Sequence, residues 1–355
     1  MKLKALSLRN FRNYDEADIT LSEGINLIYG KNGAGKTSLL EAIYLLSTGR
    51  SFITPHLSDL IKTGGNHFFI EAHFTRDGVD QTMGIGFDGK TRQIHYNSTQ
   101  FQSFSNVIGI LPSVLYSPKD SALISGAPQE RRRFLNIQLA QIDPLYVHHL
   151  MRYHKAMKHR NALLKVKSEL SIESWEKMMA ESARYLMHKR EELILSLRPK
   201  VSQNTLSLSN ESDVFDLHYT PSISMKKIDE IERLLQKSRP KELLIGNTLI
   251  GPHRDDMHIT YRKKDAKFFA SEGQKRTLIA ALKIAEWEEL KDKLSLPPLF
   301  SIDDFGVHLD QTRLMTLKDK LSSFGQVLLT TPIEDPDTKI FIENGTYVKA
   351  NASAP

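Results

Sequence analysis

The stretch "GKNGAGKT" at residues 30–37 decides the fold, because it satisfies the phosphate-binding pattern G-x-x-x-x-G-K-[ST]. The apolar run "INLIY" (25–29) comes before it and predicts a buried strand, and "KTSLLEAIYLLST" (36–48) follows as a helix that stops at Gly49. A strand, a glycine-rich turn and a helix in this order predict a nucleotide-binding P-loop in an α/β fold. A glycine-rich turn that carries a lysine by chance would not require these neighbours.

The residue types of this loop suit a triphosphate and its metal. Glycines let the backbone wrap closely around phosphate and aim N–H groups at it, where the dipole of the following helix favours negative charge. We expect Lys36 to reach the β- and γ-phosphates and the Thr37 hydroxyl to bind Mg²⁺, so the expected cofactors are ATP and Mg²⁺. The predicted ATP contacts of the loop are Gly30, Lys31, Asn32, Gly33, Ala34, Gly35, Lys36 and Thr37.

A second group for the metal is predicted in "PPLFSIDDFGVHLD" (297–310). The apolar strand 299–302 delivers Asp303 and Asp304 at its carboxyl end, where α/β sheets place their ligands. We expect Asp303 to bind or surround Mg²⁺. Asp304 is expected to position the attacking water, so that Asp304 and Lys36 are the predicted catalytic residues. The alternative is a pair of aspartates that cap a helix.

The segment "ASEGQKR" (270–276) predicts a second anion site, since a glycine with small polar neighbours precedes an amphipathic helix. Lys36 and Asp303 lie 267 positions apart, which is the arrangement of ABC-type ATPase heads of the SMC class, with a large insertion between the halves of the site. That class requires Ser-x-Gly-Gln before a helix and holds each ATP between one P-loop and the opposing subunit's signature. Ser271, Gly273 and Gln274 are therefore expected to contact the ATP of a second copy. A serine N-cap alone would explain the helix start but not the Gly-Gln.

Charge and composition narrow the class of protein further. The 355 residues carry a net charge of +6, and residues 119–200 hold 16 Lys and Arg against 9 Asp and Glu. This local excess predicts a surface that faces a polyanion. Arg131, Arg132 and Arg133 are the candidates for DNA phosphates, the alternative being that they neutralise acidic neighbours. The chain has no cysteine, no long apolar run and no secretion signal, so we expect a cytoplasmic protein without a membrane partner.

Along the chain, strand patterns at both ends surround a helical middle. Residues 1–125 are expected to form the N-terminal part of an ATPase lobe, and 126–240 a helical insertion. Residues 241–355 are expected to complete the ATPase lobe with the signature and the acidic strand, beginning with a strand in "ELLIGNTLIG" (242–251). The expected architecture is an ABC-type P-loop ATPase head, a mixed α/β sheet with flanking helices, with an inserted mainly helical lobe.

These motifs together resemble the RecF family of bacterial recombinational-repair ATPases. The similarity covers about residues 1–332 and includes "LSLRNFRNY", "SGAPQERRRFL" and "LIGPHRDDM". The segments "RRRFLN" and "IGPHRDD", which overlap these stretches, are not general ABC motifs. The chemistry of His253 and Arg254 in the last of these does not follow from the sequence. The chain departs from the family at Val307 and His308, which replace a Ser-Glu pair expected at the dimer interface.

The resemblance implies a weak, DNA-stimulated ATPase rather than a metabolic enzyme. It further implies an ATP-dependent homodimer on single-stranded and gapped duplex DNA, with slow hydrolysis as a release timer. RecO and RecR are the implied partners in loading recombinase during SOS-linked repair and replication. The alternative is an ABC-type nuclease or defence ATPase, which would need a metal-binding nuclease domain after residue 332. A transporter ATPase would need a shorter insertion and a membrane partner.

Overall fold

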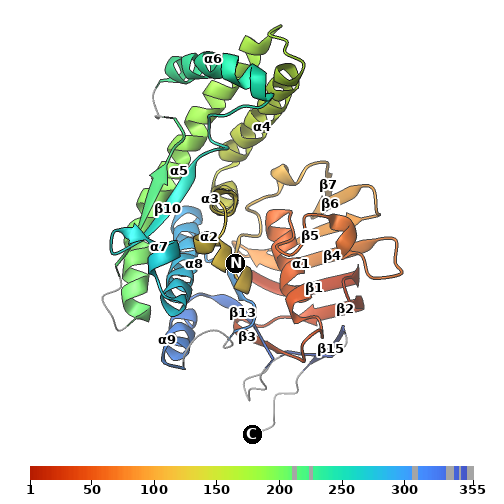
Figure 1. Ribbon diagram of the computed structural model, residues 1–355. Helices are drawn as coiled ribbons and strands as arrows, with labels where there is room; N and C mark the ends of the chain where they lie inside the picture. Colours follow the sequence, from red (N-terminus) through yellow and green to blue (C-terminus); the bar gives the residue numbers. More distant parts are fainter. Residues whose placement is uncertain (210–213, 224–226, 306–310, 333–339, 344, 350–355) are drawn as a thin grey trace. The chain divides into compact units, whose positions relative to one another are not determined.

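The computed structural model describes residues 1–209, 214–223, 227–305, 311–332, 340–343 and 345–349, and the chain forms two compact units. Unit 1 contains residues 1–120, 204–212 and 272–355, and unit 2 contains residues 121–203 and 213–271. Figure 1 traces the chain through both units. Each unit is described by itself below.

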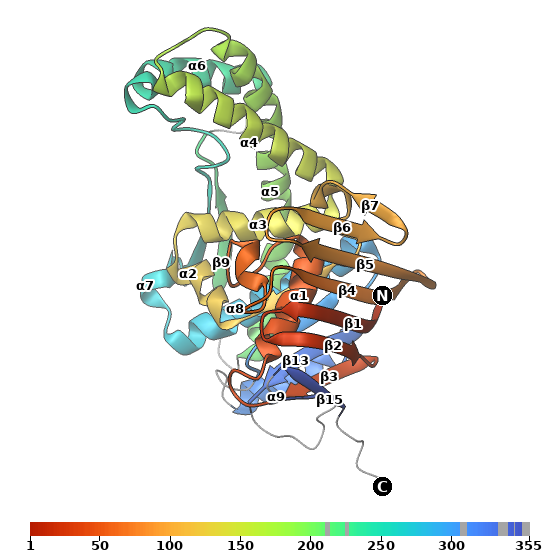
Figure 2. The ribbon, with the colours of Figure 1, turned by 90° about the vertical axis from the view of Figure 1, so that its right-hand side faces the viewer.

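Unit 1 contains an antiparallel sheet of six strands, which Figure 2 shows in their spatial order. This order is β2 (Tyr14–Thr20), β1 (Lys2–Phe11), β4 (Phe68–Arg76), β5 (Val79–Phe87), β6 (Arg92–Tyr96) and β7 (Thr99–Phe101). A hairpin at Asp88-Gly89 joins β5 to β6, where Gly89 has φ 87° and the Asp88 carboxylate accepts hydrogen bonds from the Lys90 and Thr91 amides. The Asp-Gly dipeptide thus forms the kind of turn that these residue types favour.

The second sheet of unit 1 is mixed and carries the nucleotide motifs. Its order is β15 (Thr346–Lys349), β14 (Ile340–Glu343), β3 (Gly24–Tyr29), β13 (Gln326–Thr331), β12 (Leu299–Ile302) and β8 (Ser113–Tyr116). All neighbours are parallel except β15, so the carboxyl ends of β3, β13 and β12 lie at one edge. Sites in α/β folds form at this edge.

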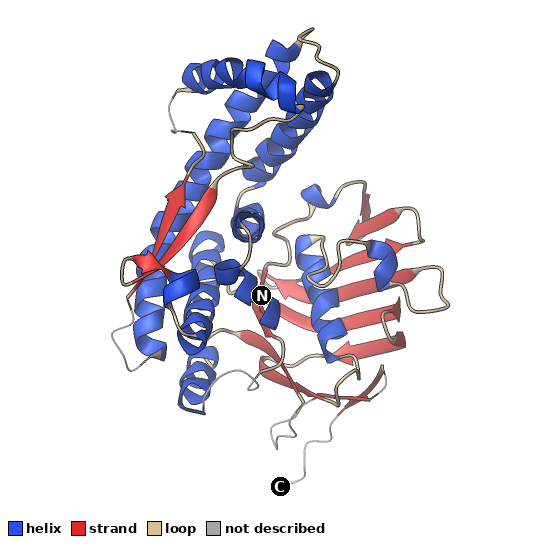
Figure 3. Ribbon diagram, in the orientation of Figure 1, coloured by secondary structure: helices blue, strands red, loops and turns tan. Residues whose placement is uncertain are grey.

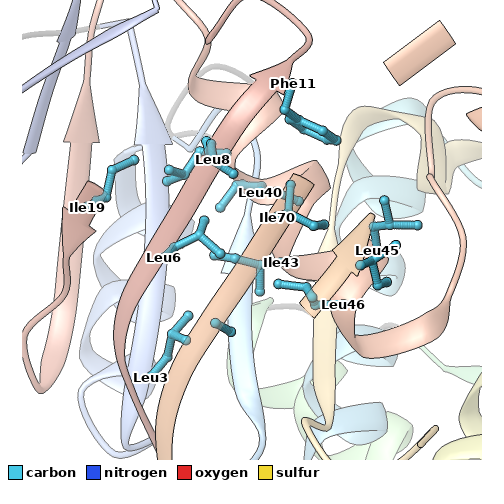
Figure 4. Packing of buried hydrophobic residues seen from close by; sticks show 14 of the residues in the cluster. Leu3, Leu6, Leu8, Phe11, Ile19, Leu40, Ile43, Leu45, Leu46 and Ile70 are labelled. Carbon is cyan, nitrogen blue, oxygen red and sulfur yellow. The ribbon is translucent and has the colours of Figure 1, made fainter. Parts of the chain in front are cut away.

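Helix α1 (Lys36–Thr48) joins the two sheets, because it contacts β1, β4 and β5 of one and β8 and β13 of the other. Ten of its 13 residues are buried, as expected of a helix that is covered on several sides. Figure 4 shows Leu40, Ile43 and Leu46 beside Leu6 and Ile70 of the antiparallel sheet. This packing fixes the helix whose first residues belong to the P-loop. Unit 1 also holds α8 (Glu272–Leu294) and α9 (Gln311–Leu321).

Unit 2 is mainly helical and includes a small sheet (Figure 3). Its helices are α2 (Ala122–Ser125), α3 (Pro128–Ile142), α4 (Pro144–Lys165), most of α5 (Ile172–Leu208), α6 (Ile228–Ile245) and α7 (Ala266–Phe269). Three strands pair in the order β11 (Lys264–Asp265), β10 (Asp256–Tyr261) and β9 (Phe215–Thr220). An apolar stripe of α5, with residues at spacings of four and seven, is buried at Met179, Leu186, Leu193 and Leu197.

The structure differs from the sequence expectation between residues 241 and 271. The strand expected over 242–251 is wrong, because α6 continues to Ile245 and ends at Gly246, which has φ 79°. Glu242 is fully buried on that helix and pairs with the buried Arg160 at 2.6 Å, a contact that local sequence does not encode. Residues 241–271 also belong to unit 2 rather than to the ATPase lobe, since β10 pairs along its whole length with β9.

Candidate functional site

The predicted nucleotide loop lies directly after β3, between that strand and α1. Gly33 and Gly35 have φ values of 82° and 118°, which L-residues with side chains rarely adopt. A Cβ at Gly35 would lie 2.8 Å from Asn13 Nδ2, and one at Gly30 would lie 2.4 Å from the Ile342 carbonyl oxygen. The loop therefore requires glycine at position 33 for its backbone angle, at position 30 for the space around it, and at position 35 for both reasons.

Two residues from the turn between β1 and β2 hold the loop in place. The Asn13 side-chain amide donates to the Ala34 carbonyl at 2.9 Å, and the Tyr14 hydroxyl donates to the Gly35 carbonyl at 3.0 Å. Burial raises the pKa of Tyr14, so its hydroxyl stays protonated as this donor. Our prediction from the sequence missed both residues. An Asn in the turn after β1 and a Tyr at the start of β2, neither of which caps a helix, were the available signal.

The Lys36 ammonium points back into the loop that precedes it. Its Nζ donates to the carbonyl oxygens of Gly30 at 2.6 Å and Lys31 at 3.1 Å, and the residue is 5% exposed. Burial lowers the pKa of Lys36, and the nearby carboxylates of Asp304 and Asp303 oppose this shift. The ammonium is thus desolvated before any ligand arrives, which strengthens its attraction to a phosphate.

Thr37 and Asp303 meet at the carboxyl edge of the mixed sheet. The Thr37 hydroxyl lies 2.9 Å from Asp303 Oδ1 and 3.1 Å from Oδ2, and the Thr330 hydroxyl donates to the same Oδ1 at 2.8 Å. Burial raises the pKa of Asp303, more strongly than these two hydrogen bonds lower it. A buried carboxylate with a raised pKa is a group that a cation would stabilise in its charged form.

This pair fits the metal that the sequence predicts. Mg²⁺ prefers oxygen ligands, and protein sites usually supply one or two of them while phosphates and water complete the shell. A hydroxyl and a carboxylate within hydrogen-bonding distance meet that requirement. Thr37 and Asp303 are the residues that would hold the ion. Among the described residues, no group of three or more His, Asp and Glu has the spacing of a separate metal site.

Asp304 follows in an unusual backbone conformation. Its φ is 56°, and its amide donates to the Thr330 hydroxyl at 2.9 Å while the Phe305 amide donates to the Thr330 carbonyl at 2.7 Å. The strand-to-loop turn therefore directs Asp303 and Asp304 differently. Thr330, which holds both, was missed by the sequence analysis, although a polar residue at the end of the apolar strand "QVLLTT" marks this edge.

A cavity of about 740 Å³ opens beside these groups, which is within the usual size range of ligand pockets. Its lining residues include Lys36, Thr37 and Asp304 and, from segments that we had not assigned, Arg12, Asn13, Asp59, Lys62 and Thr63. Arg12 is anchored there by two hydrogen bonds of 2.7 Å to the fully buried Glu41 of α1. Arg12, Lys36 and Lys62 thus contribute cations to the lining of the cavity.

The signature segment lies at the start of α8, which begins at Glu272, within the signature and before the expected position after Gly273. Ser271 precedes the helix and is exposed, Glu272 is its first residue, and Gly273 and Gln274 lie in its first turn. The Thr277 hydroxyl donates to the Gly273 carbonyl at 3.0 Å. Val307 and His308, where the sequence departs from the family pattern, lie outside the described residues.

All three adjacent arginines of α3 have partners, and those of Arg131 and Arg132 lie within unit 2. Arg131 makes a bidentate pair with Asp256, with N–O distances of 2.7 and 2.8 Å, and its side chain is 12% exposed. Arg132 donates to the Asp255 carbonyl at 2.7 Å, and Arg133 also has a partner. These contacts favour the alternative interpretation, in which the run neutralises acidic neighbours, over contact with DNA phosphates.

The segment "IGPHRDD" forms a buried polar network in unit 2. The Asp255 carboxylate lies 3.2 Å from Arg190 Nη1, and both side chains are at most 2% exposed. His253 Nδ1 lies 2.7 Å from the Tyr153 hydroxyl and Nε2 lies 3.1 Å from the Thr248 carbonyl. A carbonyl can only accept, so Nε2 carries the proton and Nδ1 accepts from Tyr153. Burial lowers the pKa of His253 to about 4.

None of the helices in the described part of the chain combines the length and the apolar character needed to cross a bilayer.

The model of the RecF/RecN/SMC N-terminal domain family matches residues 2–335. Among curated proteins, the DNA replication and repair protein RecF of Protochlamydia amoebophila (strain UWE25) is 46% identical in an alignment of 353 positions that covers 96% of this chain and 98% of that protein. RecF of Chlamydia abortus is 39% identical, over 93% of this chain and 92% of its own.

Solved structures agree with this fold. The recombination mediator protein RecF bound to ATP, of the RecFOR pathway, matches with a TM-score of 0.92 and 30% identity, over 98% of this chain and 97% of the other. An Smc head domain from Pyrococcus furiosus matches with a TM-score of 0.56 and 16% identity, over 98% and 95%. The second likeness shows the fold alone. Together they confirm the expected ABC-type ATPase head with a mixed sheet and flanking helices.

Proposed function

The chain belongs to the RecF family, and from this premise we propose that it is an ATP-gated, DNA-binding protein of bacterial recombinational repair and replication. Its relatives carry the name DNA replication and repair protein, and a solved RecF with 30% identity was determined with ATP. The site described above supports the same ligand for this chain. We also propose that ATP binding, dimerisation and hydrolysis form a cycle, that RecO and RecR are its partners, and that it is located in the cytoplasm.

The nucleotide is proposed to bind in the cavity beside the P-loop. The backbone amides of residues 30–37 would surround the phosphates, and Lys36, already desolvated, would place its ammonium at the β- and γ-phosphates. Mg²⁺, held by Thr37 and Asp303, would neutralise charge on the transferred phosphoryl group. The contact between Thr37 and Asp303 is the single observation that carries this proposal, because it joins the two halves of the motif.

Hydrolysis is proposed to depend on Asp304. Most ABC-type ATPases place a glutamate at this position, and aspartate is one methylene shorter. Its carboxylate would lie further from a water in line with the γ-phosphate. Because a displacement of about 1 Å can lower a rate on the order of 100-fold, we expect slow turnover that acts as a release timer. DNA would stimulate it by tightening the site.

A second copy of the chain is proposed to complete the site. Ser271 is exposed just before α8, and Gly273 and Gln274 are half-buried in its first turn, which is the position from which a helix N-terminus binds an anion. They would contact the γ-phosphate of the ATP held by the opposing P-loop. ATP would thereby control dimerisation, on single-stranded and gapped duplex DNA. RecO and RecR are the proposed partners for loading recombinase there, because the solved relative belongs to the RecFOR pathway.

Light scattering with and without ATP and Mg²⁺ tests this cycle. The parent chain should change from monomer to dimer with ATP, and the same change should occur at lower protein concentration on gapped DNA. Ser271→Arg should bind ATP like the parent but remain monomeric, since a bulky cation enters the interface. Ser98→Arg, at an exposed serine in the turn between β6 and β7, is the matched control and should dimerise. If the Ser271→Arg variant still forms the ATP-dependent dimer, the signature segment only caps α8 and does not contact the second copy's ATP.

A further inference from the structure

The segment that links β10 to the signature carries exposed aromatic rings among cations. Phe268 and Phe269 in α7 are 73% and 55% exposed, which is unusual for phenylalanine. Four exposed basic residues lie within the six positions that precede Phe268. We define the hairpin patch as these six residues: Arg262, Lys263, Lys264, Lys267, Phe268 and Phe269.

The rings and the cations of the hairpin patch are in contact with each other. Lys264 Nζ lies 4.8 Å from the centroid of the Phe269 ring, and Lys267 Nζ lies 5.6 Å from that of Phe268. These distances are typical of cation–π interactions. One carboxylate, that of Asp265, lies among them and accepts a hydrogen bond from the Lys267 amide, so the patch keeps a clear positive excess. An anion that also presents flat rings is the matching ligand.

The backbone of the hairpin supports a binding role. Thr260 pairs with Asp265 and Tyr261 with Lys264, so Arg262 and Lys263 form a two-residue turn. Their φ values are 48° and 64°, in the left-handed region that such turns usually fill with Asn-Gly. Two long cationic side chains are therefore held where the local geometry disfavours them. Strain of this kind gathers at functional positions.

We propose that the hairpin patch binds single-stranded nucleic acid, with unstacked bases on Phe268 and Phe269 and backbone phosphates at the four cations. Single-strand-binding proteins combine these two features, since every base offers a π-face and every nucleotide a negative charge. A second copy of this chain would bring an equally positive patch, which opposes a symmetric contact here. The inference rests on the proposed DNA-binding function and assigns a surface to it.

The test measures the affinity of a fluorescent oligo(dT) at several salt concentrations, with and without ATP. Phe268→Ala with Phe269→Ala should weaken binding about 10-fold or more and leave the salt slope unchanged, because stacking is lost and no charge is. The control replaces Leu244 and Ile245 of α6, which are 82% and 50% exposed, by Ala and should bind like the parent. Duplex DNA, whose bases are already stacked, should not distinguish the ring variant from the parent.

A second pair of substitutions, in the two-residue turn, tests the contribution of its charges. Arg262→Asn with Lys263→Gly installs the preferred turn sequence, so the variant should be at least as stable as the parent while the salt slope falls by about 0.7 for each lost phosphate contact. Lys237→Gln with Lys241→Gln, at exposed positions of α6 outside the basic segment 119–200, is the charge-matched control. A stabilised turn with weaker binding cannot be explained by misfolding.

Each outcome decides the inference. Unchanged oligo(dT) affinity in both patch variants, with a parent that binds, overturns the hairpin patch and leaves the proposed function intact. A parent that binds no DNA overturns both. Variants that lose only the ATP-dependent dimer in light scattering would make the patch an interface between copies. Variants that lose only binding to vesicles of anionic phospholipid would make it a lipid surface. Either of these results rejects the nucleic-acid assignment.

Discussion

Thr37 Oγ1 lies 2.9 Å from Asp303 Oδ1, although 266 positions separate the two residues. Thr37 is the second residue of α1 and Asp303 directly follows β12, and their contact depends on β3 and β12 both lying parallel to β13. Burial of the carboxylate and its contact with a hydroxyl make a cation the natural addition to this pair. The first two predictions test this arrangement.

Lys36→Ala should lower ATP affinity by about 10- to 150-fold, because a hydrogen bond to a charged group contributes about 1.5–3 kcal/mol. The fold should survive, since the ammonium contacts only carbonyls of its own loop in the described contacts. Isothermal titration with ATP and Mg²⁺ measures the effect. Lys90→Ala, at an exposed turn, is the control. Parent-like affinity in Lys36→Ala would remove the P-loop assignment.

Substitutions of Asp303 and Asp304 should affect different steps. Asp303→Asn should bind ATP with little dependence on Mg²⁺, and the ligand-free protein should be at least as stable as the parent because burial already disfavours the charge. Asp304→Asn should bind ATP and dimerise normally but release phosphate on the order of 100-fold more slowly. Steady-state phosphate release and melting curves measure both. Parent-like turnover in Asp304→Asn would mean that another residue positions the water.

His253 should make unit 2 less stable as the pH falls. Its folded pKa of about 4 lies below the ordinary value of 6.5, so between these values the unfolded chain binds more protons. The free energy of unfolding should therefore fall by about 2 kcal/mol between pH 7.5 and pH 5. Urea titrations that follow Trp175, in a Trp287→Phe background, measure unit 2.

His253→Gln should remove most of that pH dependence and be less stable at pH 7.5, because the contact with Tyr153 changes. His258→Gln, at an exposed position of β10, is the control and should keep the parent's pH profile. An equal pH dependence in parent and His253→Gln would mean that another group takes up the proton on unfolding.

Arg131 and Asp256 should be coupled in stability. Removing either partner leaves a charge in a site that is 12–15% exposed, so each single alanine variant should lose about 1–3 kcal/mol of unfolding free energy. The double variant should lose clearly less than the sum. If Arg131 instead contacts DNA phosphates, the Arg131→Ala variant should keep its stability, and the salt dependence of its DNA binding should be weaker. Urea unfolding and DNA titrations of the same variants separate the two roles.

Local patterns were sufficient for much of the fold. The run from β3 through the P-loop to α1, the hairpin at Asp88-Gly89 and the buried stripe of α5 follow from spacing within a few turns or strand residues. The order and spacing of the motifs also identified the family. These features are decided by backbone geometry and by the period of apolar residues, which a single sequence displays directly.

The tertiary structure alone decided which distant polar groups meet. Burial of Asp303, Glu242 and His253 required partners from other segments, because a buried polar group without one costs free energy. Their partners are fixed by sheet order and helix packing, which no local period specifies. For the same reason the sequence suggested a strand where α6 continues, and it suggested DNA phosphates for Arg131 where the fold supplies Asp256.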